Sequence, residues 1–161
     1  SHWGKNVFIV PGVLLALYFD PRLAVAQTSI FIAIGFVAAC LVASSNYVLN
    51  EILDAESDRH HPAKHSRPLA SGRAGKTAAW IWFAGLAFLG MAAGMLVNGP
   101  FAVCCAALWL MGIAYNVPPL RLKDKPFLDV LSEAANNPIR LGMGWYAAGL
   151  VRAPPPLSAQ R

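Results

Sequence analysis

Five apolar stretches separated by short polar segments dominate the sequence. They cover residues 7–19, 23–49, 77–97, 101–115 and 127–151. A helix that crosses the hydrocarbon core of a bilayer needs about 20 predominantly apolar residues. We therefore predict an all-α, polytopic transmembrane bundle of about five spans that forms a single domain over residues 1–152. The proline-rich end of the chain, residues 153–161, is expected to be a disordered tail.

Composition supports an integral membrane protein. Hydrophobic residues make up 57% of the 161 residues and charged residues only 13%, whereas a soluble domain carries about 25% charged residues. The net charge of +5 does not indicate a nucleic-acid partner, because the cations lie between apolar stretches and form no basic helix. Cys40, Cys104 and Cys105 lie inside apolar stretches without metal-type spacing, so we expect them to be packing residues.

The second apolar stretch ends in polar residues with helical spacing. Asn46, Asn50, Asp54 and Asp58 are four residues apart, which places them on one face of a helix. Glu51 lies one residue off this row and could reach the same ion. Hard oxygen ligands suit Mg²⁺, which usually binds one or two carboxylates plus substrate phosphates. The alternative is a solvated loop, which would not need its acids at strict four-residue intervals.

Cations follow this row and recur after the fourth apolar stretch. Lys64 and Arg67 lie in the first polar segment, and Arg121 and Lys123 in the later one. Cations beside a carboxylate–metal site neutralise the remaining charge of a diphosphate. For Arg121 and Lys123 the alternative is a plain topological signal of positive loops on the cytoplasmic side.

These segments resemble the UbiA superfamily of membrane prenyltransferases. The row at 50–58 is similar to the first aspartate-rich motif of that superfamily, NDxxDxxxD, with Glu51 where aspartate is usual. RPLASG at 67–72 is similar to the RPLxSG segment that follows the motif, and YNVPPLRLK at 115–123 to YxxPPLRLK. The resemblance covers nearly all of this chain but only about the N-terminal half of a fold with nine helices.

The resemblance implies a Mg²⁺-dependent transferase. In the family, metal at the acidic motifs holds the diphosphate of a polyprenyl donor, and a lipid or aromatic acceptor attacks the allylic cation that forms. Asn50, Asp54 and Asp58 would be the catalytic and metal-binding residues. The implied substrate contacts are Asn46, Glu51, Lys64, Arg67, Tyr115, Arg121 and Lys123.

Three functions stay open. The first is prenyl transfer from a polyprenyl diphosphate. The second is phosphoribosyl transfer from phosphoribosyl diphosphate to a polyprenyl phosphate, since HWGKN at 2–6 and HPAKHSRP at 61–68 are similar to the decaprenyl-phosphate phosphoribosyltransferase branch. The third is a non-catalytic, truncated membrane paralogue. The family has a second aspartate-rich motif, and Asp129-x-x-x-Glu133 comes too early to be it. We therefore expect a fragment, or half of an assembly such as a homo-oligomer.

The fifth apolar stretch carries a polar row of its own. Asp129, Glu133, Asn136 and Arg140 recur at intervals of four, three and four residues. Ionisable groups inside a membrane normally face a bundle interior or a water-filled cavity. We predict that this row lines a cavity. A structural ion pair between Glu133 and Arg140 is the alternative.

The distribution of Lys and Arg predicts the topology. Nine of these residues fall on the side of the acidic motif and three on the opposite side, with Arg140 inside the membrane. Positive charge is enriched in cytoplasmic loops. We therefore expect the acidic motif on the cytoplasmic face of the plasma (inner) membrane.

Overall fold

The chain folds as an all-α bundle. The computed structural model describes residues 2–24 and 26–149, and within them it contains helices but no strand. The predicted tail at 153–161 lies outside the described residues. The α-helices are α1 (Ile9–Phe19), α2 (Ala26–Arg59), α3 (Lys76–Val97), α4 (Gly99–Asn116) and α5 (Leu128–Ala147). Three short 3₁₀ segments accompany them: η1 (His2–Phe8), η2 (Pro21–Leu23) and η3 (Leu122–Asp124).

The five helices match the five predicted stretches, but they differ as membrane spans. Among the described residues, α2, α3 and α4 are long and apolar enough to cross a bilayer. The first apolar helical stretch, Gly4–Phe19, is shorter, and α5 carries the polar row of the fifth stretch. The predicted all-helical fold is confirmed, and three of the described helices are long and apolar enough to cross a bilayer.

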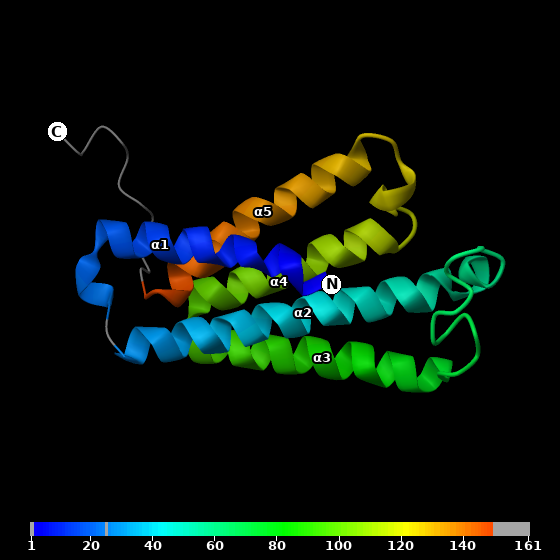
Figure 1. Cartoon of the computed structure of the whole chain (residues 1–161), viewed down its shortest axis with the longest axis horizontal. Coiled ribbons are helices and arrows are strands. Elements are labelled where there is room, and N and C mark those ends of the chain that lie inside the picture. The colour runs from blue at the N-terminus through cyan, green and yellow to red at the C-terminus, as the bar shows by residue number, and fades with distance from the viewer. Residues whose placement is uncertain (1, 25, 150–161) are drawn as a thin grey trace.

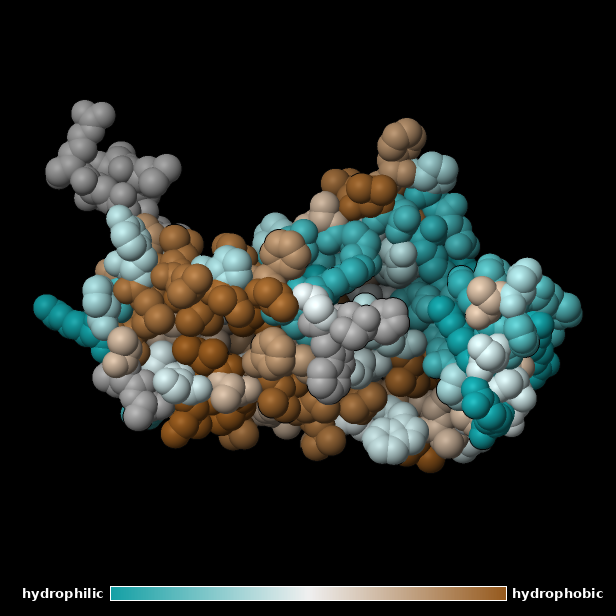
Figure 2. All heavy atoms as spheres, in the orientation of Figure 1, coloured by the Kyte–Doolittle hydropathy of each residue, from teal (hydrophilic) through white to brown (hydrophobic). Residues whose placement is uncertain are grey.

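The helices run along the long axis of the molecule, so polar connections gather at one end (Figure 1). The α2–α3 and α4–α5 connections both lie at that end. Figure 2 shows hydrophilic residues concentrated there, while the rest of the visible surface is largely hydrophobic. Large apolar side chains such as Trp82, Phe88, Leu96 and Val103 are more than half exposed. In a bilayer these side chains would contact lipid.

Small residues set the spacing between helices. Gly90 of α3 packs against Val42 of α2, where an added Cβ would lie 2.7 Å from Val42 Cγ2. Gly94 faces Cys105 of α4. Gly90 and Gly94 form a GxxxG pair, whose small residues allow close helix approach. Here the pair acts within one chain. Gly85 differs, because nothing lies within 4 Å of the position that its Cβ would occupy.

The tightest contact joins α1 and α5. A Cβ on Gly144 would collide with the carbonyl oxygen of Ile9, and one on Gly12 with that of Leu141. Ile9 and Met143 are buried in the same core, together with Phe101 of α4. Backbone atoms cannot move aside as a flexible side chain can. The two glycines therefore hold α5 against α1, which positions the polar row of α5.

We predict that Gly144→Ala destabilises the bundle by about 1–3 kcal/mol, because overpacking forces backbone shifts. The matched control is Gly85→Ala, which meets open space and gains about 1 kcal/mol of helix propensity. Thermal unfolding in detergent, followed by circular dichroism, measures both variants. An unchanged melting temperature for Gly144→Ala would contradict the close α1–α5 contact.

Candidate active site

The acidic row lies on a single continuous helix. As the four-residue spacing predicted, Asn46, Asn50, Asp54 and Asp58 lie on one helix, because α2 extends to Arg59. The alternative of a solvated loop over these residues is wrong. A helix of 34 residues is about 51 Å long at 1.5 Å per residue. Its last part therefore projects beyond the apolar body of the bundle, where the polar connections surround it (Figure 1).

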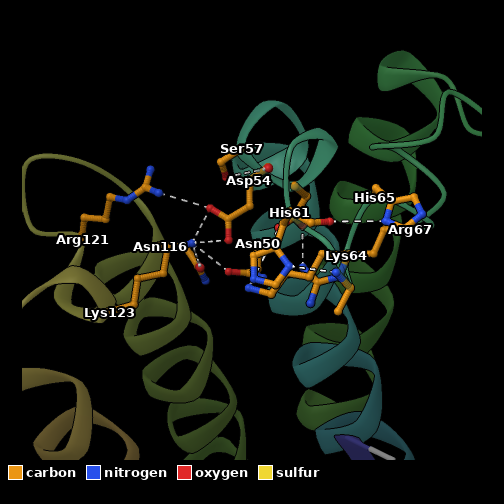
Figure 3. Close-up of polar contacts among 12 residues, drawn as sticks. Asn50, Asp54, Ser57, His61, Lys64, His65, Arg67, Asn116, Arg121 and Lys123 are labelled. Atoms are coloured by element: carbon orange, nitrogen blue, oxygen red, sulfur yellow. Dashed lines mark hydrogen bonds and ion pairs between the residues drawn. The ribbon is translucent and has the colours of Figure 1, made fainter.

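Cations from the α4–α5 connection face the middle of the acidic row (Figure 3). The Lys123 Nζ donates to both carboxylate oxygens of Asp54, at 2.6 and 2.7 Å, and to Asn50 Oδ1 at 2.9 Å. Arg121 Nη2 lies 3.2 Å from Asp54 Oδ1. Arg121 adopts a left-handed backbone with φ of 34°, which is uncommon for a residue other than glycine. The turn at Arg121 therefore helps to direct both cations toward α2.

Asp58 is paired by the other connection. Arg67 Nη1 donates to Asp58 Oδ2 at 2.7 Å, and Lys64 Nζ lies 4.0 Å from Asp58 Oδ1. Only 3% of Asp58 is exposed. Each aspartate of the motif is thus matched by cations from a different connection, Asp54 from α4–α5 and Asp58 from α2–α3.

Glu51 contacts the α2–α3 connection. Its Oε1 accepts a hydrogen bond from the backbone N–H of Leu69 at 3.1 Å. The side chain lines neither of the cavities described below. Because Glu51 lies about 100° around the helix from Asn50, it reaches the α2–α3 connection instead of the acidic row. In this structure Glu51 holds the α2–α3 connection, and a substrate contact of Glu51 stays a prediction.

Two adjoining cavities surround the motif. The larger, about 360 Å³, is lined by side chains from α2, α4 and α5, including Asn46, Asn50, Asp54 and Tyr115, and by Lys123 of the α4–α5 connection. The smaller, about 330 Å³, lies between Asp54, Asp58, Lys64 and Arg121. Four cationic and two anionic side chains line the larger cavity: Lys5, Lys64, Lys123, Arg140, Asp54 and Glu133. This excess of positive charge favours an anionic ligand.

Three of the four residues of the polar row of α5 line the larger cavity, as predicted; Asp129 does not. Glu133, Asn136 and Arg140 line it, and Tyr115 Oη donates to Asp129 Oδ1 at 2.7 Å. The predicted alternative, a Glu133–Arg140 ion pair, is wrong. Lys5 binds Glu133 at 2.6 Å instead.

Comparison with known proteins shows which family the chain resembles. The model of the UbiA prenyltransferase family matches residues 6–159. The chain belongs to the UbiA prenyltransferase family. It is 37% identical to nodulation protein NoeC of Azorhizobium caulinodans, over 92% of this chain and 46% of that protein. It is 28% identical to decaprenyl-phosphate phosphoribosyltransferase of Mycolicibacterium smegmatis, over 92% of this chain and 46% of that protein.

The fold also matches that of a solved UbiA homologue from Archaeoglobus fulgidus bound to DMAPP and Mg²⁺. The TM-score is 0.75 at 20% identity, covering 99% of this chain and 57% of that chain. This likeness confirms the fold as part of the UbiA fold. The chain spans less than half the length of the curated relatives that it matches.

The oxygen atoms of this UbiA-family site fit a magnesium ion. Four oxygen atoms lie within 3.3 Å of the Lys123 ammonium: Asn50 Oδ1, both carboxylate oxygens of Asp54, and Asn116 Oδ1. The positive charge of Lys123 is therefore surrounded by oxygen atoms, as a metal ion would be. No three histidine, cysteine or carboxylate side chains of the described residues gather into a metal site. That is compatible with Mg²⁺, which needs few carboxylates when phosphate oxygens complete its shell.

Two site residues were missed from the sequence. Asn116, the last residue of α4, accepts from Lys123 at 3.3 Å. Its place directly after Tyr115, in the segment that resembles the family pattern, was an available signal. Lys5 lies 128 residues from Glu133, and no sequence spacing reveals that partnership. Both residues line the larger cavity.

We predict that Glu51→Ala loosens the α2–α3 connection. The change leaves the buried N–H of Leu69 without an acceptor, at a cost of about 1–3 kcal/mol. Trypsin should then cleave several-fold faster after Lys64 or Arg73, as resolved by mass spectrometry. Glu51→Gln keeps an acceptor and should behave like the unmodified chain, and Glu56→Ala on the same helix is the control. Equal cleavage rates in all four proteins would contradict this role.

Proposed function

We propose that this chain holds the Mg²⁺-bound diphosphate of a polyprenyl donor and so carries the donor site of a transferase. The observation that carries the proposal is the convergence on one point of oxygen ligands from α2 and cations from the α4–α5 connection. The oxygen ligands of such a site match the positive metal ion, and its cations match the negative diphosphate. The prenyl group would pass from C1 of the donor to a lipid or aromatic acceptor.

In this proposal the residues change partners when the donor binds. Asn50, Asp54 and Asp58 would hold Mg²⁺, with Asn116 and Asn46 behind them. When bound, the ion neutralises the diphosphate as it leaves, which is otherwise a poor leaving group. Lys123 and Arg121 would release Asp54, and Lys64 and Arg67 would release Asp58. These four cations would then bind phosphate oxygens of the donor. Their charge-assisted hydrogen bonds fix the orientation of the donor.

A second candidate is phosphoribosyl transfer from phosphoribosyl diphosphate to a polyprenyl phosphate. The specific observation is that amides and charges outside the acidic motif also line the larger cavity, at Asn46, Asn136, Arg140, Lys5 and Glu133. Such a wall suits a hydroxylated sugar better than a hydrocarbon chain. Relatives named decaprenyl-phosphate phosphoribosyltransferase from three genera support this candidate.

We further infer that the chain lies in the plasma membrane with the acidic motif on the cytoplasmic side. The clustering of both cation-bearing connections at one end of the bundle supports this orientation (Figure 1). Soluble phosphorylated donors and Mg²⁺ would then reach the motif from the cytoplasm.

We predict Mg²⁺-dependent binding of farnesyl diphosphate or phosphoribosyl diphosphate to the purified chain in detergent, measured by isothermal titration calorimetry. Asp54→Asn/Asp58→Asn should weaken that binding by more than about tenfold, since changes even behind metal ligands cost this much. Glu56→Gln, an exposed acid on the same helix that pairs with Arg59, is the matched control and should bind normally.

The ligand that binds more tightly in this experiment distinguishes between the two transferase candidates. Metal-dependent binding of farnesyl diphosphate favours prenyl transfer, and binding of phosphoribosyl diphosphate alone favours the second candidate. Absence of metal-dependent binding of both ligands would overturn the proposal for this chain. It would favour the non-catalytic alternative.

A further inference from the structure

Lys123 lies among the oxygen atoms of the acidic motif (Figure 3). Its Nζ donates to both carboxylate oxygens of Asp54, at 2.6 and 2.7 Å, to Asn50 Oδ1 at 2.9 Å and to Asn116 Oδ1 at 3.3 Å. Only 11% of the Lys123 side chain is exposed, and 13% of that of Asp54. An ammonium group has three donors, so these four oxygen atoms satisfy it fully. Lys123 therefore holds oxygen atoms that the proposed Mg²⁺ site also uses.

The ion pairs around the motif carry an excess of positive charge. Three aspartates and four cations form them: Asp54, Asp58, Asp124, Lys64, Arg67, Arg121 and Lys123. A divalent cation that enters alone adds charge of the same sign, which is unfavourable. An ion that enters with a diphosphate brings more negative than positive charge with it. The charge balance of the motif thus favours the pair over the free ion.

The position of Lys123 is more than charge neutralisation requires. Arg121 Nη2 already lies 3.2 Å from Asp54 Oδ1, and neutralisation does not need contacts with two side-chain amides. A cation placed between a carboxylate and two amide oxygens occupies the place that a metal ion would take. The two roles differ in one consequence. Any nearby charge can neutralise Asp54, whereas only Lys123 contacts all of these oxygen atoms.

Lys123 can leave this place without the movement of a long helix. It belongs to η3 (Leu122–Asp124), a three-residue segment of the α4–α5 connection, and its ammonium is carried on a flexible stem. Lys123 also lines the smaller cavity beside Asp54. Phosphate oxygens in that cavity can replace Asp54 as acceptors, because ammonium–phosphate hydrogen bonds are charge-assisted and strong.

We propose that Lys123 makes the acidic motif selective for a metal–diphosphate pair over the free metal ion. Without a diphosphate, Lys123 keeps the oxygen atoms of Asn50 and Asp54 and competes with a divalent cation for them. With a diphosphate, Lys123 binds phosphate oxygens and releases those atoms. This exchange adds to the direct attraction between the ion and the diphosphate. The inference rests on the proposed donor site and adds that its metal enters together with the diphosphate.

The test is binding of Mn²⁺ alone to the full 161-residue chain in detergent. Mn²⁺ takes the same oxygen ligands as Mg²⁺, and the free ion gives an electron paramagnetic resonance signal that is lost on binding. Lys123→Met should bind Mn²⁺ at least about tenfold more tightly than the unmodified chain, a factor typical of coupled sites. Combining Lys123→Met with Asp54→Asn should abolish that gain, because the ion then loses its carboxylate.

Two further lysine variants are the controls. Lys64→Met removes an equal charge, 4.0 Å from Asp58 Oδ1, and should raise the Mn²⁺ affinity much less than Lys123→Met does. Lys125→Met removes an exposed lysine of the same connection that lines neither cavity, and should leave the Mn²⁺ affinity unchanged. Equal gains in Lys123→Met and Lys64→Met would show a general charge effect and overturn the inference.

A second variant separates the loss of the charge from damage to the fold. Lys123→Gln keeps an amide donor for Asp54 without the positive charge, and should show the same gain in Mn²⁺ affinity. Inorganic diphosphate, the group common to both candidate donors, is then titrated calorimetrically with and without Mg²⁺. The factor by which Mg²⁺ tightens diphosphate binding should fall at least about tenfold in both variants, since this coupling is reciprocal.

The outcomes distinguish this inference from the donor-site proposal. If neither Lys123 variant gains Mn²⁺ affinity, the role of Lys123 in selectivity is wrong. Mg²⁺-dependent diphosphate binding by the unmodified chain would still support the donor site in that case. If the unmodified chain shows no Mg²⁺-dependent diphosphate binding, the donor site is wrong and the selectivity inferred from it is wrong as well.

Discussion

The polar row on α2 begins at Asn46, within the apolar part of the bundle, where its side chains cannot face hydrocarbon, and this constraint organises the bundle. Amides and carboxylates that contact hydrocarbon lose the hydrogen bonds that they make in water. The other helices therefore turn polar residues toward α2: Lys123 meets Asp54, and Asn46 Nδ2 donates to the backbone of Leu108. The close α1–α5 contact through Gly12 and Gly144 completes the enclosure. The cavity thus follows from satisfying this one row of side chains.

Much of the fold could be predicted from the sequence because each membrane helix is marked by a local run of apolar residues. The apolar stretches fixed the five helices closely, with the predicted 77–97 becoming Lys76–Val97 and 101–115 becoming Gly99–Asn116. The cations at the motif were also predictable, since Arg67, Arg121 and Lys123 belong to short patterns. The end of α2 was less clear, because a charged stretch has no hydropathy signal to tell a helix from a loop.

Partnerships between distant residues were not predictable. Glu51 and Asn50 are neighbours in sequence, yet one binds the backbone of a connection and the other faces the cavity. The polar row on α5 suggested, as one alternative, that Glu133 would pair with Arg140 of its own helix. Lys5 reaches Glu133 first because the N-terminal segment packs across α5, and that placement depends on the tertiary fold. Spacing along a helix identifies a face but does not identify what lies opposite it.

The length of α2 also sets the depth at which chemistry would occur. A hydrocarbon core of about 30 Å accommodates about 20 helical residues, and α2 has 34. If the helix enters that core near Ala26, the core ends near Asn46, and Asp54 stands at the level of the lipid head groups. A phosphorylated lipid could then slide in laterally from the leaflet with its tail still solvated by neighbouring chains. The phosphate group of this lipid would stay at the depth that it occupies in the free bilayer. Binding to the protein would then require almost no work to pull the lipid out of the membrane.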